Sequence, residues 1–426
     1  MSLRVAFETF GCRSNYADTV DLQAALVEKG LTPCGMDTEA DVYVVNTCTV
    51  TNEADKAASK IIKKIRSDNP EARIVVTGCM AEVGEEAISE LEAADAIIGP
   101  GRREQILSAI VGQEEQVLTS KSEEDPAFVS FETLQVGREK RPKRSGANFR
   151  SISLDHQLSP ALQGPGSKLG DVPVRARYHL RIQEGCENSC TFCIIPQSRG
   201  RLSSRAKADI IEDIQKLADV GYNEVVLTGT HIGGYGEDFG ANFLELLSLV
   251  EAKSAISRVR LSSIDPNDVS YEMVDLLSKS NTFCDHLHIC IQAFDDGVLK
   301  RMNRLYRLEE VFDILNYISN KWPRCCLGSD VITGFPGETR EDVEREIEVF
   351  NKLPFSYLHV FPYSERQGTA AERLDGVVPI NERRRRAARW RAEAGVQIIP
   401  GEINPVQVIQ KCQSDRERAS HVVPET

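Results

Sequence analysis

The chain has 426 residues, of which 41% are hydrophobic and 27% charged, and it carries a formal net charge of −13. This is an ordinary globular composition with room for two or three domains, and the acidic balance argues against nucleic-acid affinity spread over the whole surface. Residues 1–13 lack a basic start followed by an apolar stretch, and no run of about 18 apolar residues occurs. We therefore expect a cytoplasmic protein that does not span a membrane, in which the twelve cysteines are metal ligands or buried thiols and not disulfides.

Short β-rich runs alternate with helical patterns from Leu3 to about Gly112. The runs are Arg4–Phe7, Val42–Asn46, Arg73–Thr77 and Ala96–Ile98. The clearest helical pattern begins near Asn52, whose side chain can cap it, and its apolar face consists of Ala54, Ala57, Ala58, Ile61, Ile62 and Ile65. This alternation predicts an α/β domain with a parallel sheet over residues 1–112.

Residues 113–174 show no sustained periodicity and contain Ser-, Gly- and Pro-rich pieces, so we interpret them as a linker with a candidate strand at Ala127–Phe131. The linker also carries a basic run with a single local acid, Glu139; its members are Arg138, Lys140, Arg141, Lys143, Arg144 and Arg150. Such a run is compatible with a solvated flexible segment and equally with a contact to nucleic acid.

The alternation of strands and helices resumes after Arg175. Strands are expected at Tyr178–Gln183, Glu224–Thr228, Arg258–Ser263, Leu287–Gln292, Leu327–Thr333 and Tyr357–Phe361. Six such units predict a partial (β/α)6 barrel over residues 175–375, open at one side, with its site beyond the C-terminal ends of the strands. In residues 376–426 we expect a basic helix from about Glu382 to Glu393, short extended pieces at Val396–Ile399 and Val406–Ile409, and a disordered polar tail from Ser414.

Three cysteines directly after the first strand of the predicted barrel, Cys186, Cys190 and Cys193, are separated by three and then two residues. This spacing is too tight for disulfide partners and one ligand short of a closed metal site. An iron–sulfur cubane held by three thiolates leaves one iron free to bind a small molecule. The alternative is a zinc site with a fourth ligand such as His179.

Three more cysteines, Cys12, Cys48 and Cys79, each follow a predicted strand of the first domain. Parallel strands bring such loops to one edge, and Gly11 and Gly78 allow close turns, so these thiols predict a second three-thiolate site. For any one of them alone, packing of a small thiol at a strand end is the alternative. The cysteines without ligand spacing, expected mostly as buried packing residues, are Cys34, Cys284, Cys290, Cys325, Cys326 and Cys412.

A glycine-rich turn, Thr228–Gly236, follows the second strand of the predicted barrel and should share an edge with the cysteine triplet. Its backbone amides could bind the carboxylate or amino group of a ligand. Asp330–Thr339 is a similar turn, in which Glu338 or Thr339 could equally be a helix cap. His231 and His288 could be acid–base residues, with a hydrogen-bonded core or loop histidine as the alternative.

With both cysteine trios and the barrel pattern in place, the sequence resembles the radical S-adenosylmethionine methylthiotransferase family from residue 3 to about residue 375. The resemblance implies that Cys186, Cys190 and Cys193 ligate the 4Fe-4S cluster that binds S-adenosylmethionine. It also implies an auxiliary 4Fe-4S cluster on Cys12, Cys48 and Cys79. Other matching blocks are Glu224–Gly236, Arg260–Pro266, His286–Gln292, Lys300–Tyr306, Ser329–Thr339 and Phe361–Thr369. In these blocks the residues expected to contact S-adenosylmethionine are Gly229, Gly233, Gly234, Ser262, Gln292 and Asp330.

The runs Asn46–Asp55 and Met302–Tyr306 look most like the branch that modifies threonylcarbamoyladenosine beside the tRNA anticodon. This implies addition of a methylthio group to C2 of N6-threonylcarbamoyladenosine at position 37 of tRNA, by radical chemistry from S-adenosylmethionine with sulfur held or donated by the auxiliary cluster. The implied partners are the tRNA anticodon loop and an electron donor such as a flavodoxin or ferredoxin; the sulfur donor is not indicated. The alternatives are the branches acting on isopentenyladenosine in tRNA or on an aspartate of a ribosomal protein, and a non-catalytic cluster-containing RNA-binding protein.

Two positions depart from the family pattern. Gln292-Ala293-Phe294 stands where Gln-Ser-Gly is usual, and Gln367 stands where proline is common. Family members also usually end in a small β-barrel that grips RNA, whereas no run of five alternating strands follows Arg391, which predicts a short or degenerate C-terminal RNA-binding module. Basic candidates for phosphate contacts, each of which could instead be a solvated or ion-paired surface residue, are Arg199, Arg201, Arg205, Lys300, Arg301, Arg304, Arg307 and Arg383–Arg386.

Overall fold

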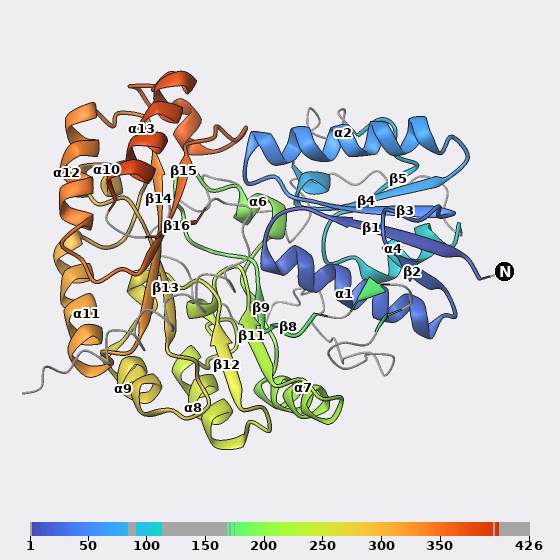
Figure 1. Cartoon of the computed structure of the whole chain (residues 1–426), viewed down its shortest axis with the longest axis horizontal. Coiled ribbons are helices and arrows are strands. Elements are labelled where there is room, and N and C mark those ends of the chain that lie inside the picture. Colours follow the sequence, from blue (N-terminus) through green and yellow to red (C-terminus); the bar gives the residue numbers. More distant parts are fainter. Residues whose placement is uncertain are drawn as a thin grey trace, which may run out of the picture. The chain divides into compact units, whose positions relative to one another are not determined.

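The structure is a computed structural model that describes residues 2–83, 91–112, 168–169, 172–173, 175–394 and 397–399. The chain divides into two compact units, one of Met1–Arg260 with Ser364–Glu372 and one of Leu261–Tyr363 with Arg373–Thr426. Figure 1 shows their elements coloured along the sequence. No helix in the described part of the chain is long and apolar enough to cross a lipid bilayer.

The first unit contains a five-stranded parallel sheet with the strand order β2-β1-β3-β4-β5. Its strands are β1 (Arg4–Thr9), β2 (Thr32–Cys34), β3 (Val42–Thr47), β4 (Arg73–Gly78) and β5 (Ala96–Ile97), and its helices are α1 (Arg13–Glu28), α2 (Asn52–Asp68), the 3-10 turn η1 (Cys79–Glu82) and α4 (Arg103–Ile110). The predicted parallel α/β fold is confirmed. The sequence pattern does not reveal β2, because three residues on a sheet edge carry almost no periodicity.

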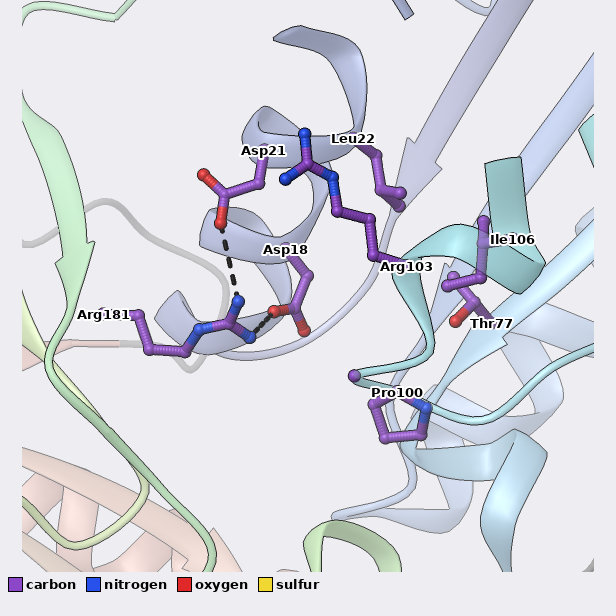
Figure 2. Close-up of a pocket in the computed structure, with 9 residues that line it drawn as sticks. Asp18, Asp21, Leu22, Thr77, Pro100, Arg103, Ile106 and Arg181 are labelled. Carbon is purple, nitrogen blue, oxygen red and sulfur yellow. Dashed lines mark hydrogen bonds and ion pairs between the residues drawn. The ribbon is translucent and has the colours of Figure 1, made fainter. Parts of the chain in front are cut away.

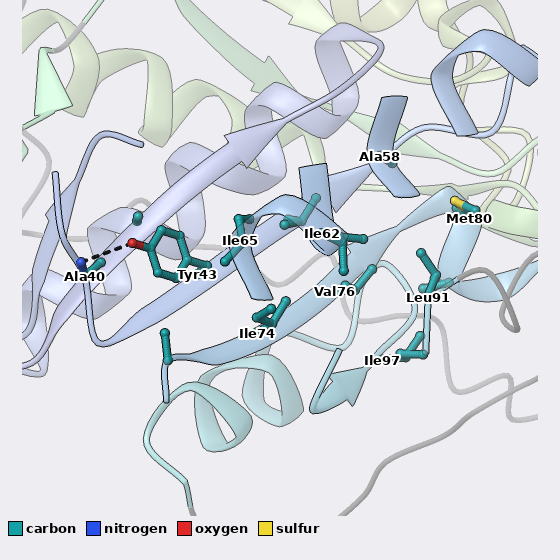
Figure 3. Close-up of a cluster of buried hydrophobic side chains, with 14 of the residues drawn as sticks. Ala40, Tyr43, Ala58, Ile62, Ile65, Ile74, Val76, Met80, Leu91 and Ile97 are labelled. Carbon is teal, nitrogen blue, oxygen red and sulfur yellow. Dashed lines mark hydrogen bonds between the residues drawn. The ribbon is translucent and has the colours of Figure 1, made fainter. Parts of the chain in front are cut away.

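Helices cover both faces of this sheet, with α2 on one face and α1 and α4 on the other (Figure 1). Alternate residues along each strand point to opposite faces, so each strand serves two cores. The core beneath α2, drawn in Figure 3, includes Tyr43, Val45, Ile74, Val76, Ala58, Ile62 and Ile65. The core beneath α1 and α4 includes Val5, Val42, Val44, Val75, Leu22, Leu26, Ile106 and Leu107.

Helix α2 begins at Asn52, as predicted, but the residue that caps it is Thr51. The backbone of Thr51 is extended, and its hydroxyl accepts a hydrogen bond from the amide of Ala54. Asn52 is already helical, so its side chain cannot take the capping position. The apolar stripe is also narrower than predicted, because Ala57 is exposed whereas Ala58 is buried.

The first unit continues through the elements that carry the cysteine triplet. They are β8 (Tyr178–Arg181), β9 (Gln183–Glu184), α6 (Ile195–Arg199), β10 (Ser203–Ser204), α7 (Lys207–Asp219), β11 (Glu224–Thr228), η3 (Ile232–Gly234), α8 (Phe243–Lys253) and β12 (Arg258–Leu261), whose last residue is assigned to the second unit. Strands β12, β11 and β8 form a sheet in that order, with β8 and β11 parallel. Strands β9 and β10 pair antiparallel, as do β6 (Lys168–Leu169) and β7 (Val172–Pro173).

The second unit contains a parallel sheet with the order β13-β14-β15-β16. Its elements are η4 (Pro266–Asp268), α9 (Tyr271–Lys279), β13 (His286–Gln292), α10 (Asp296–Arg301), α11 (Leu308–Lys321), β14 (Cys326–Thr333), α12 (Arg340–Phe350), β15 (Tyr357–Pro362), α13 (Ile380–Glu393) and β16 (Gln397–Ile399). The 3-10 turn η5 (Ala370–Arg373) lies at the boundary between the units. All six strands predicted for the barrel are present within three residues of their expected ends.

Phe294, which departs from the family pattern, is part of the core of the second unit. Its side chain is buried and packs edge-on against Phe350, with ring centroids 5.1 Å apart. It also packs against the tilted ring of Trp390 of α13, with centroids 6.0 Å apart. A small residue at this position would leave a cavity beneath α13, so the departure serves packing in this chain.

Several predictions concern residues outside the described ranges and stay predictions. These are residues 113–167 of the predicted 113–174 linker, with its candidate strand and basic run, the pieces beyond Ile399, and the degenerate C-terminal module. Near its end the predicted linker contains the short paired strands β6 and β7, which the sequence pattern did not indicate. The predicted domain boundaries also stay predictions.

Candidate functional site

The cysteines Cys12, Cys48 and Cys79 lie where three neighbouring strands end. Cys12 follows β1 and precedes α1, Cys48 directly follows β3, and Cys79 directly follows β4. The register pairs the ends of these strands, with Thr9 opposite Asn46 and Thr47 opposite Gly78. In a sheet of order 2-1-3-4-5, ligands bind at the carboxyl ends of β1 and β3, where the strand order reverses.

Two contacts show that these three side chains converge. A Cβ on Gly11 would lie 2.4 Å from the Cβ of Cys48, so Cys48 packs directly against the turn that carries Cys12. The Oδ1 atom of Asn15 lies 3.9 Å from the Sγ of Cys12 and 4.0 Å from the Sγ of Cys79. The trio therefore fits a shared three-thiolate site.

Asn15 holds the loops of this trio together. Its Nδ2 donates to the carbonyls of Phe10 and Thr47, at 2.9 and 2.8 Å, which precede Cys12 and Cys48. Sequence reasoning missed Asn15; its place one helical turn after Cys12 was the available signal.

Burial and mutual proximity affect the protonation of two thiols of this trio. Burial, followed by the proximity of Cys79 and Cys12, raises the pKa of the Cys48 thiol to about 12. Burial also raises the pKa of Cys79, although the charge of Arg199 acts in the opposite direction. The thiolate forms of Cys48 and Cys79 are thus costly without a cation, and metal binding would have to displace their protons.

The second trio, Cys186, Cys190 and Cys193, lies on one loop between β9 and α6. Cys186 and Cys190 are each 9% exposed, and Cys193 is partly exposed. The loop is fixed at its start by Gly185, which has φ +73° and whose Cβ would lie 1.9 Å from the carbonyl oxygen of Arg201. Only glycine fits there.

The glycine-rich turn after β11 is tied to the same loop, as predicted from its place on the sheet edge. Thr230 donates from Oγ1 to the carbonyl of Gly185 at 2.6 Å, and Gln183 donates from Nε2 to the same carbonyl at 2.6 Å. The Oε1 of Gln183 accepts from the amide of His231 at 2.9 Å. Gln183 thus couples the turn to the triplet.

Packing explains two of the glycines in this turn. A Cβ on Gly234 would lie 2.6 Å from Leu202, and one on Gly229 would lie 2.7 Å from Gln183. The amide of Gly234 already donates to the carbonyl of His231. Contact of Gly229, Gly233 and Gly234 with S-adenosylmethionine stays a prediction.

The spacing of the thiols bears on the zinc alternative. One zinc ion with Zn–S bonds of about 2.3 Å holds its thiolates about 3.8 Å apart. In the described part of the chain, the ligand atoms of His288, Asp330 and His359 all lie within 4.8 Å of one another. Neither cysteine trio has its three sulfurs that close together. His179 instead lies edge-on to Tyr16 at 5.4 Å, and burial with nearby Arg13 lowers its pKa to about 3.

Two groups of residues join the trios within the first unit. Arg181 of β8 forms ion pairs with Asp18 and Asp21 of α1, as Figure 2 shows. Ser364–Glu372 returns to the first unit, where the amide of Ala371 donates to the carbonyl of Thr191 at 2.8 Å, between Cys190 and Cys193. This returning segment contacts both cysteine loops, because Arg366 donates to the carbonyl of Thr49 at 3.0 Å.

Arg366 should be important for the stability of the loop that carries Cys48. It is buried and also forms an ion pair with Asp55. Replacing Arg366 by methionine removes this ion pair from the partly buried carboxylate of Asp55. We expect the free energy of unfolding to fall by about 3 kcal/mol. Lys207→Met, which removes an exposed pair with Glu245, should change it by about 1 kcal/mol or less in the same urea titration. Equal effects of the two substitutions would contradict this role.

Three predicted cofactor contacts lie in the second unit. The Oγ of Ser262 is buried with no hydrogen-bond partner among the described residues, which fits a hydroxyl that awaits a ligand. Gln292 has φ +75° at an irregularity of the β13 register, a strained conformation of the kind found at binding sites. Their contact with S-adenosylmethionine stays a prediction.

Asp330, the third of them, belongs to a polar row across β13, β14 and β15. Its Oδ1 lies 2.9 Å from Nε2 of His288 and 3.1 Å from Nδ1 of His359, and its Oδ2 lies 3.3 Å from the Sγ of Cys290. The Nδ1 of His288 lies 3.0 Å from the hydroxyl of Tyr357. His288 is therefore a hydrogen-bonded core histidine, and sequence reasoning missed His359.

The pKa of Asp330 predicts a pH dependence. Burial alone would raise this pKa, but His288 and then His359 outweigh burial and lower it. The carboxylate thus stabilises the fold at pH values above about 3.9, the ordinary aspartate pKa, and this contribution is lost as the pH falls toward the lowered value. Asp330→Asn should cost about 1–3 kcal/mol at pH 7 in guanidinium unfolding, less below about pH 4. The exposed Asp313→Asn control should show no such trend, and a cost for Asp330→Asn that grew on acidification would contradict the assignment.

The structure corrects several candidates for phosphate contact. Arg199 and Arg205 are buried and ion-paired within the first unit. Arg383 donates to the carbonyls of Val378 and Tyr363, and Arg386 pairs with Glu338. These four arginines serve the protein's own packing. In the turn Asp330–Thr339, Glu338 accepts a hydrogen bond from the amide of Gly334, and Thr339 caps α12. The helix cap, given above as the alternative for this turn, is thus present for Thr339.

Comparisons with known proteins bear on this arrangement. Residues 4–99 match uncharacterized protein family UPF0004, and residues 180–350 match the radical SAM superfamily. The threonylcarbamoyladenosine tRNA methylthiotransferase MtaB of Bacillus subtilis is 38% identical over 90% of this chain and 79% of its own length. The tRNA-2-methylthio-N(6)-dimethylallyladenosine synthase of Thermodesulfovibrio yellowstonii is 32% identical over 87% of this chain and 78% of its own length.

A solved structure supports the fold. The radical S-adenosylmethionine methyltransferase TsrM from Kitasatospora setae, with cobalamin and a 4Fe-4S cluster bound, superimposes with a TM-score of 0.57 at 15% identity, over 87% of this chain and 77% of that chain. The predicted fold class, an N-terminal parallel α/β domain followed by a partial radical-SAM barrel, is thereby confirmed. With its sequence similarity spanning most of both chains, this protein belongs to the radical S-adenosylmethionine methylthiotransferase family.

Proposed function

We propose that this chain adds a methylthio group to C2 of N6-threonylcarbamoyladenosine at position 37 of tRNA. The observation that carries the proposal is that both cysteine trios lie in one compact unit of the chain. The chain is also 38% identical to a relative named as a threonylcarbamoyladenosine tRNA methylthiotransferase. The substrate is then the tRNA anticodon loop, where a base can leave its stack at low cost. A flavodoxin or ferredoxin supplies electrons, and the enzyme works in the cytoplasm.

The chain's own residues hold and shield the reactive groups. Cys186, Cys190 and Cys193 would hold one 4Fe-4S cluster and the trio around Asn15 the other; when bound, the clusters and S-adenosylmethionine supply the radical and sulfur chemistry. Gln183 and Thr230 fix the loop of Cys186, Cys190 and Cys193 through the carbonyl of Gly185.

The dimethylallyladenosine branch is the second candidate, since a relative of that name is 32% identical over most of this chain. The sequence that follows Cys48, Thr49 to Asp55, resembles the threonylcarbamoyladenosine branch instead. In the structure this run forms the N-terminal turn of α2, with Asp55 paired to Arg366. The choice of the threonylcarbamoyladenosine branch therefore rests on the sequence that follows Cys48 in the auxiliary trio.

Nucleoside mass spectrometry tests the proposal. In cells that lack the gene, we expect tRNA to accumulate threonylcarbamoyladenosine without its methylthio group. A wild-type copy should restore the modification, and a Cys190→Ala copy should not. Unchanged methylthio-threonylcarbamoyladenosine in the deletion strain would refute the proposal, and loss of the dimethylallyl product instead would select the second candidate.

A further inference from the structure

Arg199 links the two cysteine trios. It ends α6, six residues after Cys193, so the chain delivers it from the loop of the second trio. Its Nε donates to the Sγ of Cys79, in the first trio, at 3.3 Å. The side chain of Arg199 has no exposed surface, which makes this a fully desolvated contact between a cation and a thiol.

The guanidinium is held in place on its other edges. Its Nη1 donates to Glu184 at 2.6 Å, and its Nη2 donates to Asn15 and, at 2.9 Å, to Asp18. The second carboxylate oxygen of Asp18 is occupied by Arg181 (Figure 2). Because a planar guanidinium with several fixed partners cannot turn, the Nε–H stays directed at the sulfur.

A fixed N–H···S contact acts on the electron affinity of a cluster. Adding an electron to an iron–sulfur cluster increases the negative charge on its sulfurs, and hydrogen bonds to those sulfurs are among the features that set its potential. Little solvent is present to screen the charge of Arg199. The carboxylates of Glu184 and Asp18 offset part of that charge, but they do not contact the sulfur in the same direct way.

We infer that Arg199 is a positioning residue that raises the reduction potential of the auxiliary cluster through its contact with Cys79. The inference rests on the proposed assignment of that cluster to Cys12, Cys48 and Cys79. Arg199 ends α6, which directly follows the loop of Cys186, Cys190 and Cys193. Movement of α6 would therefore alter the contact between Arg199 and Cys79, and with it the reduction potential of the auxiliary cluster.

The test is a redox titration of the anaerobic holoprotein, followed by electron spin resonance of both clusters. Arg199→Lys keeps the charge but loses the directed Nε–H. We expect the ratio of reduced to oxidised auxiliary cluster at a fixed potential to fall about tenfold, a midpoint shift of ~59 mV to more negative values for one electron. Arg205→Lys is the matched control, a buried arginine paired with Asp213 at 2.5 Å, and should leave both midpoints unchanged.

The outcomes separate the inference from the proposed function. The auxiliary signal is identified as the one lost in Cys48→Ala; if that variant keeps both signals, the cluster assignment fails whatever Arg199 does. If the auxiliary midpoint in Arg199→Lys equals that of the wild type, or if Arg205→Lys shifts it equally, the inference is overturned. Should Arg199→Lys not fold, the charge-balanced Arg199→Gln/Glu184→Gln variant makes the same measurement, with the same lowered midpoint expected and an unchanged one overturning the inference.

Discussion

Replacing Cys48 by alanine should abolish methylthiolation while leaving reductive cleavage of S-adenosylmethionine intact. Cys48 packs against the turn of Cys12 and follows β3 directly, so its thiol belongs to the auxiliary trio alone. Without it, the auxiliary cluster keeps only two protein ligands. The loop of Cys186, Cys190 and Cys193 is fixed by its own contacts with Gln183 and Thr230 and should still bind its cluster.

Cys190→Ala is the reciprocal variant and should abolish both activities. For each variant we expect the yield of methylthiolated tRNA to fall more than about 100-fold. This exceeds the loss typical of removing a residue that only hydrogen-bonds to a metal ligand. Production of 5′-deoxyadenosine should stay near the wild-type rate in Cys48→Ala and disappear in Cys190→Ala. Cys34→Ala, a buried thiol in the core beneath α2, should keep both activities. If Cys48→Ala kept full methylthiolation, the auxiliary assignment would be wrong.

Gly78→Ala should unfold the cysteine-bearing edge of the N-terminal sheet. Gly78 has φ +93°, and a Cβ there would lie 2.2 Å from the carbonyl oxygen of Thr47. That oxygen belongs to β3, whose register pairs Thr47 with Gly78, so it cannot move without breaking the ladder that presents Cys48 and Cys79. We expect a loss of about 3–5 kcal/mol in chemical unfolding, from left-handed strain and the backbone clash together.

Gly30→Ala is the control for Gly78→Ala, because Gly30 has φ +75° but a Cβ there meets nothing within 4 Å. It carries the left-handed strain without the clash and should cost about 1–2 kcal/mol. Similar costs for the two substitutions would show that the clash is relieved and that the edge tolerates a shift. Iron content after reconstitution should follow the same order, lowest in Gly78→Ala.

The sequence was sufficient for the parts of the fold that depend on local pattern. Strand runs such as Val42–Asn46 appear in the structure as β3 within a residue of their ends, because buried parallel strands are continuous apolar segments. The convergence of Cys12, Cys48 and Cys79 also followed from position alone, since parallel strands must end on one edge. The cap of α2 was assigned one residue too late because both Thr51 and Asn52 are good capping residues and only the backbone conformation decides between them.

Contacts between distant segments could not be predicted from the sequence. Arg199 and Cys79 are 120 residues apart, and Arg366 and Thr49 are 317 apart, so no local pattern relates them. The arginines of α13 were misread for a related reason. A run such as Arg383–Arg386 resembles a solvated basic face, and only the buried acceptors, Tyr363 and Glu338, show that two of its members point inward.

Iron and sulfide quantitation on the anaerobically reconstituted protein tests the central claim most directly. Two cysteine trios that each hold a 4Fe-4S cluster predict about eight irons per chain in the wild type, and about four in Cys48→Ala and in Cys190→Ala. Stoichiometric zinc in place of iron, or a wild-type content of about four irons that either substitution leaves unchanged, would contradict the account.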